Sequence, residues 1–258
     1  MMQRWSEDAI RFMEDASVYG NYHKELVQEL LPFLPKNGHI CDAGCGLGHL
    51  ALELSEACAQ VTAVDASANA LRGLLSRELP TNLRVLQGDI FTMREHYDAM
   101  VFCYFGKTED ILRAAEEQCL GGVLVVRRDC SVHRFSGSTV PRREHSINML
   151  TGVLEDRGIP YMSRRISLEL GQPFRSKEDA LVFFDMYNKS HKRILLEDLE
   201  DKLVQTGDKT FPWYYPNIRE MELIVFESEN IRKKQEFPIA IWNKSCYNVA
   251  ENQMEEQV

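Results

Sequence analysis

Three glycines stand close together in this 258-residue chain, in the run of residues 39–50 that reads HICDAGCGLGHL. Gly44, Gly46 and Gly48 follow a short apolar segment and precede a segment with helical spacing. Glycine has no Cβ atom, so a turn of this kind lets the backbone approach a ligand while the N-terminus of the next helix faces it. The spacing therefore predicts a ligand site between a first strand and a first helix.

Four aspartates stand at the boundaries of neighbouring apolar segments. Asp42 lies just before the glycines, where it either organises a cofactor loop or accepts hydrogen bonds from backbone donors. Asp65 ends the second apolar run, where a carboxylate can accept hydrogen bonds from both hydroxyls of a ribose. Asp89 follows the third run, as a ligand or as a turn former. Asp98 begins the fourth run, away from the strand ends that bind ligands, and is interpreted as structural.

The glycine spacing separates two classes of cofactor. A dinucleotide fingerprint, GxGxxG, has its third glycine three residues after the second, and that position is His49 here. The order Asp-x-Gly-x-Gly-x-Gly instead resembles motif I of the class I S-adenosylmethionine (SAM)-dependent methyltransferases. Asp65, the segment Gly88-Asp89-Ile90 and the segment Tyr97-Asp98-Ala99 follow in that family's order, so the resemblance covers residues 37–127.

The resemblance implies which residues contact the cofactor. Gly44 and Gly46 would lie under its methionine part, and Asp65 would hold its ribose. Asp89 would lie near the adenine amino group, and Ile90 against the ring. The expected contacts in full, including strand-end residues beside the sulfonium and one residue of the N-terminal helices, are Asp42, Gly44, Cys45, Gly46, Gly48, Asp65, Ala66, Asp89, Ile90, Cys103, Tyr104 and Tyr19.

Methyl transfer from a sulfonium is an in-line displacement, so proximity and alignment can supply much of the catalysis. A general base is needed only where the acceptor must lose a proton as it attacks. The weak candidates for a catalytic residue are His133, His145 and Tyr22, with His23 as a further histidine. A surface position for the histidines and simple packing for Tyr22 are the favoured alternatives. Cys45 is interpreted as a small loop residue, since no partnered base is evident for a nucleophilic thiol.

Arginines gather in residues 127–143, although the whole chain carries a formal net charge of −9. This segment leaves the fifth strand beside the expected acceptor site. Its arginines either pair with carboxylates on a solvated surface or bind an anionic acceptor through bidentate contacts, with Arg134 and Arg142 as first candidates. After the fourth strand the chain reads Cys103-Tyr104-Phe105-Gly106, without the Asn/Asp-Pro-Pro-Tyr common in the family's amino-group enzymes.

Composition and residue spacing argue against nucleic-acid binding, disulfide bonds, membrane-spanning helices and metal sites. An acidic chain is not expected to bind nucleic acid. Seven cysteines at irregular spacing, with no CxxC pair, favour reduced thiols and a cytoplasmic protein. No stretch approaches the roughly 20 apolar residues of a membrane-spanning helix, and no His/Cys/Asp spacing matches a metal-ligand set.

Apolar runs that alternate with helical stretches predict the fold that positions these residues. Such an alternation favours right-handed βαβ units and a parallel sheet, with strands expected at residues 39–41, 61–64, 83–86, 99–103 and 123–126. An antiparallel pair at residues 161–170 and 220–227 would complete a doubly wound, mainly parallel seven-stranded α/β sheet of the Rossmann-like methyltransferase type. The expected division is an N-terminal helical lid, a SAM-binding domain, a helical insertion and a C-terminal tail, at residues 1–36, 37–258, about 176–206 and about 229–258.

The function favoured by these features is transfer of a methyl group from SAM to a small molecule, with an anionic acceptor as the narrower hypothesis. Two alternatives stay open. One is an NAD-dependent oxidoreductase, against which His49 counts. The other is a SAM-binding protein without catalysis. The sequence contains no signal for the oligomeric state.

Replacing Asp65 by alanine is expected to weaken SAM binding by about 1–3 kcal/mol, because charge-assisted hydrogen bonds to the ribose are lost. Isothermal titration calorimetry with SAM on the wild type and the variant measures this difference. Unchanged affinity would remove Asp65 from the site. Tight NAD binding without SAM binding would remove the family assignment.

Overall fold

The computed structural model describes residues 5–128, 147–188 and 194–236. Its centre is a seven-stranded sheet with the strand order β3-β2-β1-β4-β5-β10-β6, in which β10 alone runs antiparallel to its neighbours. These strands are β1 (His39–Ala43), β2 (Gln60–Asp65), β3 (Leu83–Gln87), β4 (Tyr97–Cys103), β5 (Cys119–Arg127), β6 (Tyr161–Glu169) and β10 (Ile218–Glu227). The doubly wound, mainly parallel sheet predicted from the sequence is confirmed.

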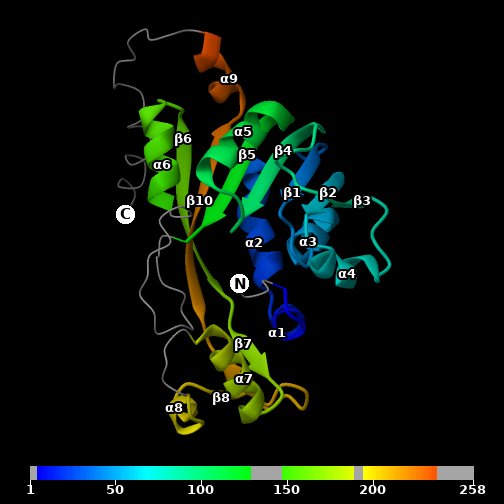
Figure 1. The fold of residues 1–258 in the computed structure, drawn as a ribbon, viewed down its shortest axis with the longest axis vertical. Helices are drawn as coiled ribbons and strands as arrows, with labels where there is room; N and C mark the ends of the chain where they lie inside the picture. Colours follow the sequence, from blue (N-terminus) through cyan, green and yellow to red (C-terminus); the bar gives the residue numbers. More distant parts are fainter. Residues whose placement is uncertain (1–4, 129–146, 189–193, 237–258) are drawn as a thin grey trace, which may run out of the picture.

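Helices cover both faces of the sheet (Figure 1). Ile40 and Ala63 belong to one face, which packs against α2 (Tyr22–Leu30), α3 (His49–Ala57) and α4 (Ala68–Leu75). Met100 and Phe102 belong to the other face, which packs against α5 (Thr108–Gln118), α6 (Ile147–Asp156) and α9 (Glu229–Glu236). Because both faces are buried, the central strands are apolar along almost their whole length.

The carboxyl ends of the parallel strands meet at one edge of the sheet. Ala43 at the end of β1 pairs with Val64, and Asp65 at the end of β2 pairs with Gln87. Open parallel sheets bind ligands at this edge. Asp98 lies at the opposite edge and accepts a hydrogen bond from the backbone N–H of His39 at 2.7 Å, which is the structural role expected for it.

The N-terminal residues form two helices and a short 3₁₀ turn, α1 (Glu7–Tyr19), α2 and η1 (Leu31–Phe33). Ser6 caps α1, since its Oγ accepts a hydrogen bond from the backbone N–H of Ala9 at 3.2 Å. Helix α2 packs on the sheet and on α3, whereas α1 packs on the insertion between β6 and β10. The predicted helical lid therefore has two halves with different partners.

The insertion is partly a second sheet and not helical throughout. Helix α7 (Lys177–Tyr187) begins after Ser176, at the expected start of the helical insertion, but the expectation of helix up to about residue 206 is wrong at its end. A short helix α8 (Glu197–Glu200) precedes β8 (Val204–Gln205), which pairs with β9 (Trp213–Tyr215), as does β7 (Gln172–Phe174). Strand β8 depends on a partner from a later segment, and local periodicity carries no signal for such a partner. The tail expected at residues 229–258 begins with α9, and its last part, 237–258, lies outside the described residues.

Helix α1 and the insertion share a core of their own. Phe12, at 0% exposure, contacts the rings of Phe174 and Phe183 with centroid distances of 6.1 and 5.0 Å. Arg11 of α1 donates a hydrogen bond to Asp179 of α7 at 2.7 Å. This aromatic core joins the first lid helix to the insertion, so the two form one covering unit over the lower end of the sheet in Figure 1.

Replacing Phe12 by alanine is expected to lower the free energy of unfolding by about 3–5 kcal/mol, because a buried ring is removed from this core. The matched control is Val18→Ala on the same helix, at a side chain that is 77% exposed, where the change should stay within about 0.5 kcal/mol. Urea unfolding followed by circular dichroism measures both values. Equal losses in the two variants would show that α1 does not depend on the aromatic core.

Candidate functional site

The glycine loop begins where β1 ends and takes a left-handed path. Gly44, Gly46 and Gly48 have φ angles of +72°, +57° and +78°, a region that strains residues with a Cβ atom. The backbone N–H groups of Gly44 and Cys45 both donate to the carbonyl of Val64, at 2.8 and 2.9 Å. The loop is thus held against the end of β2 before α3 begins.

Asp65 fixes the middle of this loop. Its Oδ2 accepts a hydrogen bond from the N–H of Gly46 at 2.9 Å, and its Oδ1 accepts one from the N–H of Ser67 at 2.8 Å. A carboxylate has about four acceptor positions, so Asp65 keeps capacity for a ligand. Ala66 between these residues is exposed beside it. The sequence did not predict that Asp65 also shapes the loop.

Asp42 is buried beneath the loop, with 1% exposure. Its Oδ2 atom has no hydrogen-bond partner among the described residues, while the backbone of Ala51 donates to the carboxyl group. Burial, and then the nearby charge of Asp65, raise the pKa of Asp42 to about 7. The sequence leaves open a structural role for Asp42 as an acceptor of backbone hydrogen bonds. Backbone donors satisfy only part of the hydrogen-bonding capacity of this carboxylate.

The turn after β3 carries Asp89 and Ile90. Asp89 is exposed, and its Oδ1 accepts a hydrogen bond from the N–H of Phe91 at 3.0 Å, which is the turn-forming alternative considered for it. The side chain of Ile90 is buried in the sheet core at 1% exposure. Phe91 stacks on Phe105, with ring centroids 5.4 Å apart and planes 4° apart. The sequence did not predict this aromatic pair, because neither residue belongs to a motif.

Two aromatic rings lie directly on the glycine loop. A Cβ atom on Gly44 would lie 2.1 Å from the Phe105 ring, and one on Gly46 would lie 3.0 Å from the indole of Trp5. Phe105 comes from the turn after β4, and Trp5 comes from the residue before the cap of α1. Sequence reasoning missed both contacts. The only local signal for Trp5 is a large apolar residue just before a helix N-cap.

A group of four side chains lies at the carboxyl end of β4 and is called the phenol cluster here. It consists of Tyr22, Tyr104, Arg219 and Met221. The hydroxyl oxygens of Tyr22 and Tyr104 are 3.2 Å apart, and both hydroxyls donate to the sulfur of Met221, at 3.4 and 3.1 Å. Tyr104 has a φ of +54°, the one positive φ recorded outside glycine in the described residues. Cys103 lies next to it, and burial raises the pKa of its thiol to about 12.

His23 and His49 pack together between the lid and α3, with ring centroids 5.2 Å apart. His49 Nε2 lies 3.8 Å from the Glu14 carboxylate of α1. Burial, and then the charges of His49 and Arg219, lower the pKa of His23 to about 3, so this imidazole is neutral at physiological pH. The His49 side chain occupies the position that a dinucleotide fingerprint reserves for glycine.

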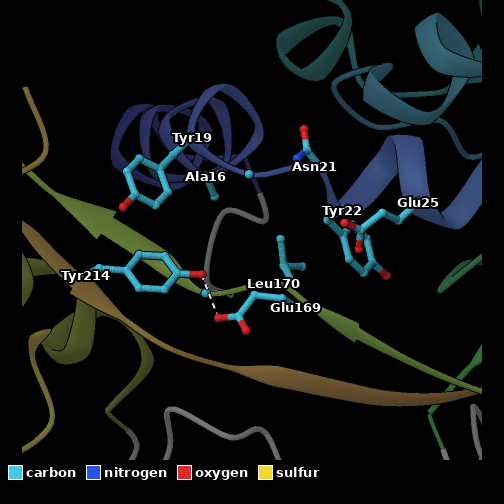
Figure 2. A pocket seen from close by; sticks show the side chains of 10 residues that line it. Ala16, Tyr19, Asn21, Tyr22, Glu25, Glu169, Leu170 and Tyr214 are labelled. Atoms are coloured by element: carbon cyan, nitrogen blue, oxygen red, sulfur yellow. Dashed lines mark hydrogen bonds between the residues drawn. The ribbon is translucent and has the colours of Figure 1, made fainter. Parts of the chain in front are cut away.

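Figure 2 shows a pocket of about 210 Å³ where the α1–α2 turn meets the end of β6 and β9. Tyr19 and Tyr214 pack against each other on one side of it, with ring centroids 5.0 Å apart, and Tyr22 also contributes to its wall. Glu169 accepts a hydrogen bond from the Tyr214 hydroxyl at 2.8 Å. Tyr19 therefore lies against the insertion. Its expected contact with the cofactor stays a prediction.

Several expected site residues cannot be placed. His133, His145, Arg134 and Arg142 lie outside the described residues. Within the described part of the chain, no group of three His, Cys, Asp or Glu side chains is arranged to hold a metal ion. No helix in residues 5–128, 147–188 or 194–236 is both long and apolar enough to span a bilayer.

Residues 40–119 match a family model described as a methyltransferase domain. Among solved structures, a candidate methyltransferase from Bacillus halodurans is 16% identical over 81% of this chain and 99% of its own, with a TM-score of 0.52. Magnesium protoporphyrin IX methyltransferase from Synechocystis with bound SAM is 15% identical over 78% of this chain and 79% of its own, with a TM-score of 0.43. A comparison with curated proteins gives no match.

Ligand binding at the glycine loop is expected to change the fluorescence of Trp5, because its indole lies on Gly46 and must move or gain a new neighbour. Titration with S-adenosylhomocysteine (SAH), monitored by tryptophan emission, measures this change. The Trp5→Phe variant should lose the change, while Trp213, in β9, still emits. The same change in both proteins would place the responsive tryptophan elsewhere.

Proposed function

Residues 40–119 match the methyltransferase-domain family model, and from this premise we propose that the chain transfers a methyl group from SAM to a small-molecule acceptor. The observation that carries the proposal is the convergence of three features at the carboxyl edge of the sheet. The glycine loop gives close backbone approach, Asp65 has remaining acceptor capacity, and Asp42 has a buried oxygen without a partner. Such features fit a cationic, ribose-containing cofactor.

In this proposal each cofactor group has a candidate partner. The backbone of Gly44 and Gly46 lies under the methionine part, with the Asp42 carboxylate available to its ammonium group. Asp65 accepts hydrogen bonds from the ribose. The Asp89 turn lies at the adenine end, where the stacked ring of Phe91 adds an aromatic surface that the buried Ile90 does not offer.

SAM supplies a methyl group on a positively charged sulfur, already activated for transfer. Tyr104 and Cys103, at the carboxyl end of β4, are neutral at physiological pH. Burial raises the pKa of Tyr104 and takes that of Cys103 to about 12, so both keep their protons. His23, with a pKa of about 3, is a weak base. We therefore propose that these residues act by positioning the acceptor and excluding water, with no strong base among them.

Calorimetry with SAM, SAH and NAD tests the choice of cofactor. Binding of SAM and SAH without NAD is expected, and the reverse would support the oxidoreductase alternative. Production of SAH from SAM with a mixture of small acceptors then separates an enzyme from a SAM-binding protein without catalysis. Cofactor binding with no turnover on any acceptor would favour the second.

Asp42 is expected to make cofactor binding depend on pH near neutrality. Its pKa of about 7 means that ionisation in the free protein is half complete there, and a cationic cofactor favours the ionised form. SAM affinity should therefore rise as pH increases from about 6 to about 8. Asp42→Asn should bind SAM more weakly, and its SAM affinity should lack the part of the pH dependence that comes from Asp42. Any pH dependence that comes from the titration of SAM itself should be the same in the variant and the wild type.

The same carboxyl group predicts the sign of a stability change. Its native pKa lies above the ordinary 3.8, so the native state binds this proton more tightly than the unfolded state. The free energy of unfolding should then fall as pH rises from about 4 to about 7, and Asp42→Asn should reduce that fall. Urea unfolding without cofactor at several pH values measures it. A variant with the same slope as the wild type would show that Asp42 ionises normally.

A further inference from the structure

Arg219 carries a positive charge, and no carboxylate among the described residues lies within ion-pair distance of it. Its guanidinium lies 5.6 Å from the ring centroid of Tyr22 and 5.3 Å from that of Tyr104, and it donates hydrogen bonds to both hydroxyls. The side chain is partly exposed, although its Nε atom is buried without a hydrogen-bond acceptor. Two neutral phenols provide no negative charge, so the phenol cluster holds a cation without a counter-charge among the described residues.

The position of Arg219 places this charge at the functional edge of the sheet. Glu222 of β10 pairs with Arg127 at the end of β5, and β10 runs antiparallel, so Arg219 lies beyond that end. Tyr104 directly follows β4, and its N–H donates to the carbonyl of Val126 at 2.9 Å. The guanidinium and the Tyr104 phenol thus meet beside the strand end where a methyl group would be presented.

A second guanidinium lies near the same ring. The guanidinium of Arg128, in the first residue after β5, lies 5.7 Å from the ring centroid of Tyr104. The carboxylates of the neighbouring pocket, Glu25 and Glu169, are exposed, so water and salt screen them. Arg219 is only partly exposed, so its charge is screened less than theirs.

We propose that Arg219 binds a carboxylate group of the methyl acceptor, with the hydroxyls of Tyr22 and Tyr104 beside it. The inference rests on the proposed function and names the substrate class of the same site. A carboxylate carries one negative charge and can accept two parallel N–H bonds from one guanidinium. Phenol hydroxyls can donate to the same oxygens. The assignment does not depend on Arg134 or Arg142.

The test uses benzoate as a probe, because the cluster combines a guanidinium with aromatic rings and a thioether. The full-length protein is first saturated with SAH, and benzoate is compared with the uncharged benzamide by calorimetry. A ligand of this size should bind with a Kd of about 1 mM, and benzamide roughly tenfold more weakly. Equal affinity for the two probes, or no benzoate binding up to roughly 20 mM, would overturn the proposal.

Arg219→Gln is expected to lose most of the benzoate affinity and to keep the SAH affinity. Arg219→Lys should recover only part of the loss, since an ammonium group lacks the planar fork. The control is Arg113→Gln, which removes the same charge from an exposed pair with Asp110 on α5 and should bind benzoate normally. Benzoate affinity unchanged in Arg219→Gln would overturn the proposal.

Thermal unfolding separates a binding role from a structural one. Without benzoate, Arg219→Gln is expected to lose some stability, because the contacts of the guanidinium with the two tyrosines are removed. With benzoate, only the wild type should gain stability. A variant that is less stable than the wild type and equally stabilised by benzoate would make Arg219 structural and overturn the assignment.

Three further outcomes show which assignment is wrong. Tighter binding of phenyl phosphate than of benzoate would overturn the carboxylate as the ligand group. Absence of SAH binding in the first step would remove the proposed function itself. Normal SAH binding with negative Arg219 results would remove only the acceptor assignment.

Discussion

The hydrogen bond from the Gly46 N–H to the Asp65 carboxylate, at 2.9 Å, connects the loop after β1 to the end of β2. The first two amides of the loop donate to Val64, one residue earlier on the same strand. The loop therefore has its shape only while the two strands keep their register. A shift by one residue would turn the Asp65 side chain to the other face of the sheet and release the loop. Helix α3 begins directly after Gly48, so its direction depends on the same contact.

The covering unit brings distant segments to this edge. Helix α1 is tied to the insertion by the core around Phe12 and by ion pairs on both sides, including Arg175 with Asp15 at 2.6 Å. Because α1 is anchored there, the chain before it places Trp5 on the glycine loop. The chain after it enters α2, which carries Tyr22 into the phenol cluster. One apolar core thus positions side chains at both the glycine loop and the phenol cluster.

Two ionisable groups in this region each have one buried polar atom without a hydrogen-bond partner among the described residues, an oxygen of Asp42 and the Nε nitrogen of Arg219. Folded proteins normally satisfy such atoms, and exceptions gather where a ligand completes them. The two groups lie on different strands, β1 and β10. Under the proposed function, a cationic cofactor would complete Asp42 and an anionic acceptor would complete Arg219.

Local sequence determined the central strands, the glycine loop and the acidic residues at strand ends. Each of these depends on spacing within a few residues, such as the apolar run before Asp65 or three glycines in five positions. Tertiary structure alone decided that Trp5 covers Gly46, that β8 pairs with β9, and that Arg219 meets Tyr104. These contacts join residues that are far apart along the chain. Their partners are chosen by strand order and core packing, which no local pattern encodes.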